Sequence, residues 1–113
     1  MAQYKLIAAP AYISSSVANL FTPLAAPAVT IIRHIHIVNR TTSTVTFSMY
    51  VGATGGSAAG TELYKDYSIA AKGTFDWYPI MRLKSTQFLT GEASAATSLV
   101  ITISGEVDAS PDL

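Results

Sequence analysis

The sequence contains no cysteine and few charged side chains. Without cysteine, the chain has no disulfide framework, no thiolate metal site and no cysteine nucleophile. Charged residues make up 12% of the chain, about half the usual share of a soluble domain. Seven Lys and Arg balance seven Asp and Glu, so the formal net charge is +0 at pH 7. This neutrality argues against a protein that neutralises nucleic-acid phosphates and against a basic membrane-surface module, and we expect neither partner.

Long apolar runs are also missing. No stretch approaches the roughly 20 apolar residues of a membrane-spanning helix. The short apolar stretch 6–11 is interrupted by Pro10 and lacks the pattern of a secretory signal, so we expect the protein to stay in the cytoplasm that makes it. A neutral, charge-poor surface gives a free protein little colloidal protection. We therefore expect copies of the chain, or a partner, to cover much of this surface.

Hydrophobic residues, which make up 50% of the 113, recur with the period of two that is typical of β-strands. In residues 44–51, Val45, Phe47 and Met49 share one face and mostly polar residues take the other. Residues 98–107 alternate in the same way. Such alternation predicts half-buried antiparallel strands.

Residues 30–39 are apolar on both faces, which is typical of a central or interface strand. Strict alternation divides this stretch into two sets: Ile32, His34, His36 and Val38, and Ile31, Arg33, Ile35 and Ile37. Weaker strand patterns cover residues 3–8, 12–21, 62–67, 74–78 and 87–92. Turn residues predict hairpins at 39–42 and 71–73, and a Gly/Ala/Ser-rich loop at 52–60 that is mobile or lies over a neighbour.

No period of 3.6 residues persists long enough to predict a helix. About eight short strands separated by polar turns predict an all-β fold, a single-domain antiparallel β-sandwich that is jelly-roll-like. We expect an N-terminal arm with the first strands in residues 1–28, the sandwich core in residues 29–107 and a flexible C-terminal tail in residues 108–113.

His34 and His36 form an H-x-H pair, which places both imidazoles on one strand face about 7 Å apart. Cupin metal sites begin with such a pair but add a carboxylate a few residues later and a third histidine from another strand. Here Asn39 and Arg40 follow the pair, and the chain has no third histidine. We expect no metal ion in a single chain, although symmetry-related copies could complete a site. The main prediction is that the rings pack or form hydrogen bonds at a sheet face or subunit contact.

No motif predicts catalysis or a cofactor. Gly55 and Gly60 have the spacing of a phosphate-binding loop, but Thr61 stands where the lysine belongs and no helix follows. The serines lack a nucleophile-elbow context, and no Asp or Glu stands in a setting typical of sugar hydrolysis. We therefore predict a protein that is not an enzyme and binds no cofactor.

Aromatic residues gather in residues 74–79. Alternation places Phe75 and Trp77 on one face, where core packing is the first interpretation, and Asp76 and Tyr78 on the other. A functional alternative is an aromatic contact surface, either an oligomer interface or a sugar-stacking platform. Asp76, Lys65, Asp66 and Arg82 could form ion pairs across subunits. The candidate interface residues are Tyr4, Tyr12, Phe21, His34, His36, Tyr64, Trp77 and Tyr78.

Strand and turn signatures across residues 29–107 resemble a known class of proteins. They occur in residues 32–41, 51–56, 60–63, 69–73, 76–78 and 98–106. The chain is similar to the small β-rich virion structural proteins of tailed bacteriophages. This resemblance implies a capsid decoration (cement) protein, or an accessory protein of the tail or connector. It also implies a homo-oligomer, with a trimer as the expected form, that contacts the major capsid protein or other virion proteins. Its location would be the virion, after assembly in the cytoplasm of a bacterial host.

Two other functions remain open at this stage. A receptor- or glycan-binding module of a tail fibre would use Trp77, Tyr78, Tyr64 and the loop at 52–60. A small cupin-like metalloenzyme would use His34 and His36.

Overall fold

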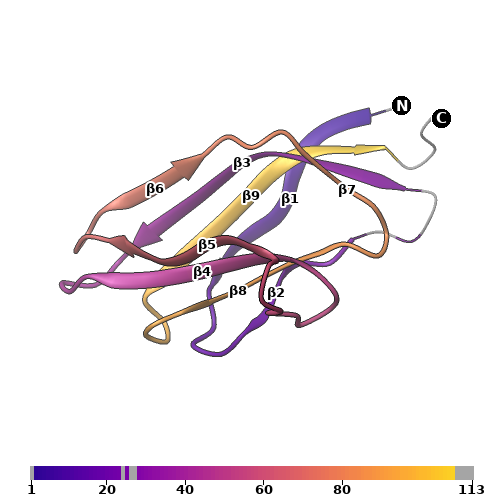
Figure 1. Cartoon of the computed structure of the whole chain (residues 1–113). Helices are drawn as coiled ribbons and strands as arrows, with labels where there is room; N and C mark the ends of the chain where they lie inside the picture. The colour runs from indigo at the N-terminus through magenta and orange to yellow at the C-terminus, as the bar shows by residue number, and fades with distance from the viewer. Residues whose placement is uncertain (1, 24, 26–27, 109–113) are drawn as a thin grey trace.

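The computed structural model describes residues 2–23, 25 and 28–108, and this part of the chain forms nine strands and no helix (Figure 1). The strands are β1 (Ala2–Tyr12), β2 (Ala18–Phe21), β3 (Val29–Asn39), β4 (Val45–Gly52), β5 (Glu62–Ile69), β6 (Thr74–Trp77), β7 (Met81–Leu83), β8 (Phe88–Ala93) and β9 (Leu99–Asp108). In the described residues, no helix could span a membrane. The predicted all-β fold is confirmed.

The strands form two antiparallel sheets that face each other (Figure 1). The five-stranded sheet has the order β1-β9-β3-β6. Strand β7 pairs with the same edge of β3 as β6 does, nearer the start of β3. The four-stranded sheet has the order β2-β8-β4-β5. If β6 and β7 are treated as one interrupted strand, the order of the strands within the two sheets is that of a jelly roll. The strand β7 was not predicted, because its three residues are too few to show a period.

The N-terminal segment is built into both sheets. Strand β1 pairs with β9 along most of its length, and β2 pairs with β8. The predicted strand at 12–21 was too long, because Tyr12 ends β1 and Ala18 begins β2. Between them, the amide of Ile13 donates to the carbonyl of Leu99 and the chain crosses to the other sheet. Of the predicted tail, Asp108 is the last residue of β9, and residues 109–113 lie outside the described part.

The core lies between the sheets and follows the predicted period of two. In β9, Leu99, Ile101 and Ile103 are buried while their neighbours are partly exposed. In β4, Phe47 and Met49 are almost completely buried. As expected, β3 is an interior strand, because β9 pairs with one edge and β6 and β7 with the other. Branched and aromatic side chains from both inner faces exclude water from this layer.

The turns at 39–42 and 71–73 were predicted as hairpins, and this was wrong. The first joins β3 to β4 and the second joins β5 to β6, so both cross between the sheets. A local turn signal reports that the chain reverses but not which sheet the next strand joins. The segment between β4 and β5 does form a hairpin loop, because these two strands pair directly.

Asn39 holds the two crossings together. It is 0% exposed, and its Nδ2 donates to the carbonyls of Ser43 (2.8 Å) and Ile69 (3.0 Å). Its Oδ1 accepts hydrogen bonds from the amide (3.0 Å) and hydroxyl (2.7 Å) of Thr41. These bonds compensate for the loss of water around a buried amide and fix the end of the sandwich where both crossings meet.

Candidate functional site

A β-bulge in β3 decides which side chains reach the surface. Pairing with β9 shifts between Ile32 and His34, so Arg33 is an extra residue in the strand. Ile32 and Ile35 are therefore both buried in the core, at 0% exposure. Strict alternation had predicted that Ile32 shares a face with His34 and His36. That was wrong, because the bulge restarts the alternation after Arg33.

The outward side chains of the five-stranded sheet form rows across its strands. The pairing registers define the rows Leu6–Ser104–His34, Thr102–His36–Asp76 and Tyr12–Val100–Val38–Thr74. We call the surface made by these rows and Tyr78 the outer face. It combines β1, β9, β3 and β6, which lie side by side in Figure 1.

Two histidines and a carboxylate meet at the centre of this face. Asp76 Oδ1 lies 2.8 Å from His34 Nε2 and 2.6 Å from His36 Nδ1. The side chains are partly exposed, at 28% for His34, 35% for His36 and 38% for Asp76. Hydrogen bonds from His36 and then from His34 lower the pKa of Asp76, because they favour its ionised form. An ionised carboxylate and two imidazole rings therefore lie together, with their ligand atoms within 4.8 Å of one another.

The surroundings of the cluster hold its rings in place. The Tyr78 ring stacks on the His34 ring, with 4.4 Å between centroids and 4° between planes. The two imidazole centroids lie 6.0 Å apart, close to the predicted spacing. On the same face, the guanidinium of Arg33 pairs with the carboxylate of Glu106.

Asp76 was not recognised as a partner of the histidine pair. Sequence reasoning assigned it only to possible ion pairs across subunits and looked for a third ligand near the pair in sequence. Alternation did place Asp76 on the opposite face from Phe75 and Trp77. Its position opposite His36 depends on the pairing of β6 with β3, across a separation of 40 residues.

Trp77 of β6 packs against Tyr64 of β5, on the opposite side of β6 from Tyr78. Their rings meet edge to face with centroids 5.0 Å apart, and Tyr64 meets Phe75 in the same way at 5.1 Å. Phe75 and Trp77 pack against the core, as the first interpretation predicted. The three aromatic residues proposed for sugar stacking therefore do not form one continuous surface, because Tyr78 faces the histidines.

The other candidate interface residues differ in accessibility. Tyr12 is 50% exposed on the outer face, and the guanidinium of Arg40 lies 5.9 Å from its ring centroid. Phe21 was predicted as a contact residue, but it is 7% exposed and belongs to the core, which leaves little of its side chain accessible to another chain. The Tyr4 side chain lies outside the described part of the chain.

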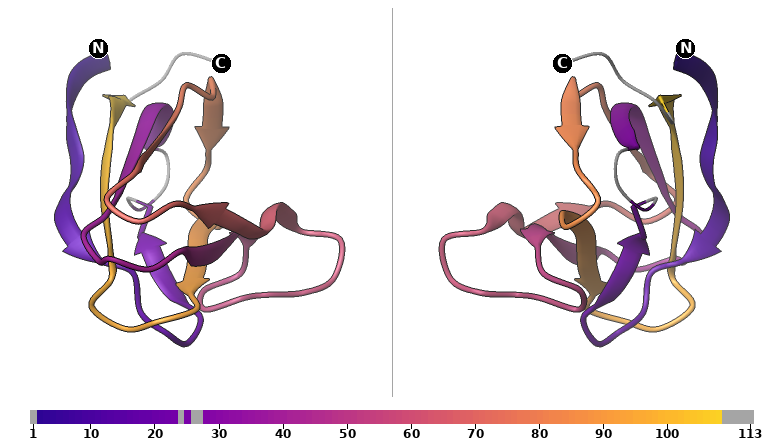
Figure 2. Two further views of the ribbon diagram at one scale, coloured as in Figure 1. Left: turned by 90° about the vertical axis from the view of Figure 1, so that its left-hand side faces the viewer. Right: turned by 90° about the vertical axis from the view of Figure 1, so that its right-hand side faces the viewer.

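The loop between β4 and β5 is tied to the sandwich from two strands. The hydroxyl of Thr90 in β8 donates to the carbonyl of Gly56 (2.5 Å). Asn19 in β2 accepts a hydrogen bond from the amide of Gly55 (2.8 Å) and donates one to the hydroxyl of Thr54 (3.0 Å). Gly55 has φ +63°, which glycine adopts readily. Figure 2 shows the loop projecting sideways from the sandwich.

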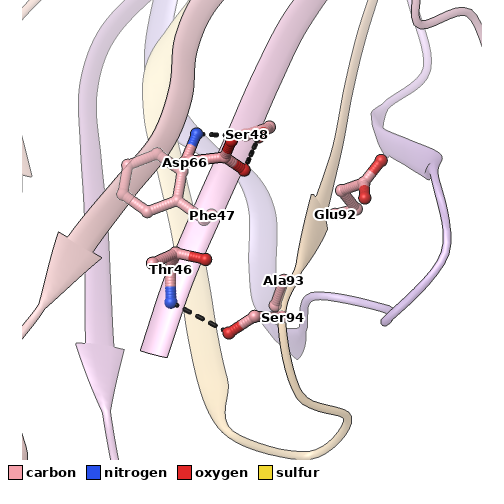
Figure 3. Close-up of a pocket in the computed structure, with 7 residues that line it drawn as sticks. All are labelled: Thr46, Phe47, Ser48, Asp66, Glu92, Ala93 and Ser94. Carbon is pink, nitrogen blue, oxygen red and sulfur yellow. Dashed lines mark hydrogen bonds between the residues drawn. The ribbon is translucent and has the colours of Figure 1, made fainter. Parts of the chain in front are cut away.

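A small hollow lies at the strands β4, β5 and β8 (Figure 3). Its lining consists of Thr46, Phe47, Ser48, Asp66, Glu92, Ala93 and Ser94. Its volume is about 120 Å³, below the range of roughly 300–1,000 Å³ that is usual for small-molecule sites. Ser48 already engages Asp66, accepting from its amide (3.0 Å). We assign no ligand to this hollow.

Comparison with known proteins identifies the fold. No family model and no curated protein matches the chain. Among solved structures, a chain in the structure of infectious bursal disease virus Gx strain matches with a TM-score of 0.59 and 11% identity. The match covers 100% of this chain and 34% of that one. A chain from the Gt strain of the same virus gives a TM-score of 0.44 and 7% identity, covering 95% and 32% respectively. This chain thus spans about a third of its structural neighbours, and the first likeness supports the sandwich fold.

Proposed function

We propose that this chain is a non-enzymatic structural protein of a virion. The finer proposal is a capsid decoration protein of a tailed bacteriophage, assembled in the bacterial cytoplasm, that binds the assembled shell as a symmetric homo-oligomer. Double-sheet jelly rolls recur in viral capsid proteins. The resemblance to phage virion proteins and the likeness to a chain of a virus structure both favour this class.

The outer face is the observation that carries the proposal. Leu6 is 53% exposed, Tyr12 50% and Tyr78 69%, and all three lie on this face. Its described charges are largely paired, Arg33 with Glu106 and Asp76 with the histidines. Exposed apolar side chains with few free charges are typical of a contact surface. Tyr12, His34 and His36, three of the predicted interface residues, lie on this one face.

A decoration protein needs no reaction to act. A protein that binds only the assembled shell stabilises it by mass action, in proportion to the logarithm of its concentration over its dissociation constant. In this proposal, copies of the chain, expected as trimers, contact one another and the major capsid protein. The outer face spans four strands and provides an area that a short loop alone would not.

Two alternatives use the same fold at another place on the particle. An accessory protein of the tail or connector would use the outer face in the same way. Two observations favour a glycan-binding module of a tail fibre. The ring of Tyr78 is exposed, and jelly rolls also occur in lectins. The packing of Trp77 against Tyr64 leaves that module without its predicted platform.

Copy number distinguishes these proposals. The measurement is quantitative mass spectrometry on purified particles of the virus that encodes the chain, with the major shell protein as internal standard. We expect a ratio near one copy, or a simple fraction of one copy, per shell subunit. A small fixed number of copies per particle would overturn decoration and support the tail or connector alternative. Complete absence would overturn the virion proposal.

A further inference from the structure

The cluster of His34, His36 and Asp76 brings together the ligand types of a transition-metal site. The ligand atoms of the three residues all lie within 4.8 Å of one another. We propose that these three side chains bind one divalent transition-metal ion of the zinc class in each chain. This site stands independently of the virion proposal and adds the ligand that the H-x-H pair lacks in sequence.

The donor set defines the class of ion. Imidazole nitrogen suits Zn²⁺, Cu²⁺ and Ni²⁺, and a carboxylate oxygen completes a three-ligand set that leaves a position open to water. Mg²⁺ and Ca²⁺ prefer all-oxygen sites. Zinc bonds to nitrogen and oxygen are about 2.0–2.2 Å long. Two ligand atoms bonded to one tetrahedral ion therefore lie roughly 3.3 Å apart. Asp76 Oδ1 must move slightly away from both ring nitrogens to admit the ion, and the partly exposed side chains have room to do so.

Binding of the ion changes where the protons of the two rings lie. Without an ion, N–H groups at His34 Nε2 and His36 Nδ1 donate to Asp76 Oδ1. The ion takes the place of these two hydrogens. Each neutral ring then carries its proton on its other nitrogen, and any ring that was charged releases one proton to water. The negative carboxylate offsets part of the charge of the ion.

Rigid elements support the three ligands. His36 and Asp76 stand directly opposite each other on paired strands, and His34 follows the bulge at Arg33. The stacked Tyr78 ring restricts His34 from one side. Ligands on neighbouring strands keep their relative positions better than ligands on loops. Among the described residues, this is the one group of three metal-ligating side chains.

The composition of the chain makes the test specific. It has two histidines and no cysteine, so every imidazole signal in an untagged protein comes from this site. The experiment is titration of chelator-treated, untagged protein with Zn²⁺ by calorimetry. Titration with Co²⁺ by visible absorption is the second measurement. We expect one ion per chain with micromolar affinity, and perturbation of both imidazole resonances in the NMR spectrum.

Variants separate this site from nonspecific binding. Asp76→Asn and His36→Gln should each weaken Zn²⁺ binding about tenfold or more, because each removes one ligand. The matched control is Asp66→Asn, which removes a carboxylate elsewhere at a residue with φ 50° that asparagine tolerates. It should bind Zn²⁺ like the unchanged chain. Circular dichroism verifies that all variants are folded.

Three results would overturn the proposal. They are no saturable binding below about millimolar Zn²⁺, equal affinity in folded Asp76→Asn and the unchanged chain, or a stoichiometry below one ion per chain. The last would mean that copies of the chain share the ion.

Discussion

At the scale of single residues, a few polar side chains hold positions that the hydrophobic pattern does not reveal. Asn39 is completely buried, yet in sequence it reads as the first residue of a turn. Asp76 reads as a surface carboxylate, yet both histidines of the chain contact it. Each depends on partners at least 30 residues away in sequence, Ile69 for Asn39 and the histidines for Asp76. Sequence alone could identify the residue types but not these partners.

Replacing Asn39 tests its role at the crossings. Asn39→Ala should lower the free energy of unfolding by about 2–3 kcal/mol, because buried carbonyls such as that of Ile69 lose their donor. Urea denaturation measures the change. The matched control is Asn19→Ala, which removes an exposed asparagine that holds the β4–β5 loop and should cost less than about 1 kcal/mol. Equal losses in the two variants would contradict this role.

At the scale of elements, the period of two predicted most strands but missed the irregularities that orient the site. The strands at 44–51 and 98–107 were found within one residue at each end, because one of their faces is buried along most of its length. The bulge at Arg33 was missed, since it depends on the pairing of β3 with β9. Gly105 pairs with Ile32, directly beside the bulge. A Cβ atom there would lie 2.0 Å from the carbonyl oxygen of Ile31.

Gly105→Ala should therefore disturb both the strand and the site. The added methyl group meets backbone rather than a flexible side chain, so we expect a loss of about 2–4 kcal/mol in unfolding free energy. Imidazole resonances should shift as well, because the bulge positions His34. Thermal and urea unfolding measure the first effect and NMR the second. As a matched control, Gly52→Ala meets its nearest neighbour at 3.9 Å and should change stability by less than about 1 kcal/mol. A neutral Gly105→Ala would show that β9 can move away from the bulge.

At the scale of the whole molecule, the jelly roll has two different outer surfaces. The outer face of the five-stranded sheet carries exposed Leu6 and Tyr12 on β1. The other sheet carries the small polar hollow and polar residues such as Ser68, paired with Thr46. This asymmetry favours association through one sheet.

Charge placed on the outer face should dissociate the oligomer. The double variant Leu6→Glu/Tyr12→Glu should run as a monomer in size-exclusion chromatography with light scattering, because association would bury two unpaired carboxylates. The unchanged chain should form an oligomer, and the control variant Ser68→Glu on the other sheet should keep it. A stable monomer of the unchanged chain at high concentration would contradict this expectation. An oligomer that survives the double variant would place its interface elsewhere.

The amino-acid sequence is enough to specify the all-β class and the sandwich, because alternating residues such as Val45, Phe47 and Met49 can bury one face only as strands. It also determined that the two imidazoles lie side by side. The crossing of the turns at 39–42 and 71–73 between the sheets, and the contact of Asp76 with the histidines, became visible in the folded chain. Strand order and register depend on contacts between distant segments, and no local period encodes them.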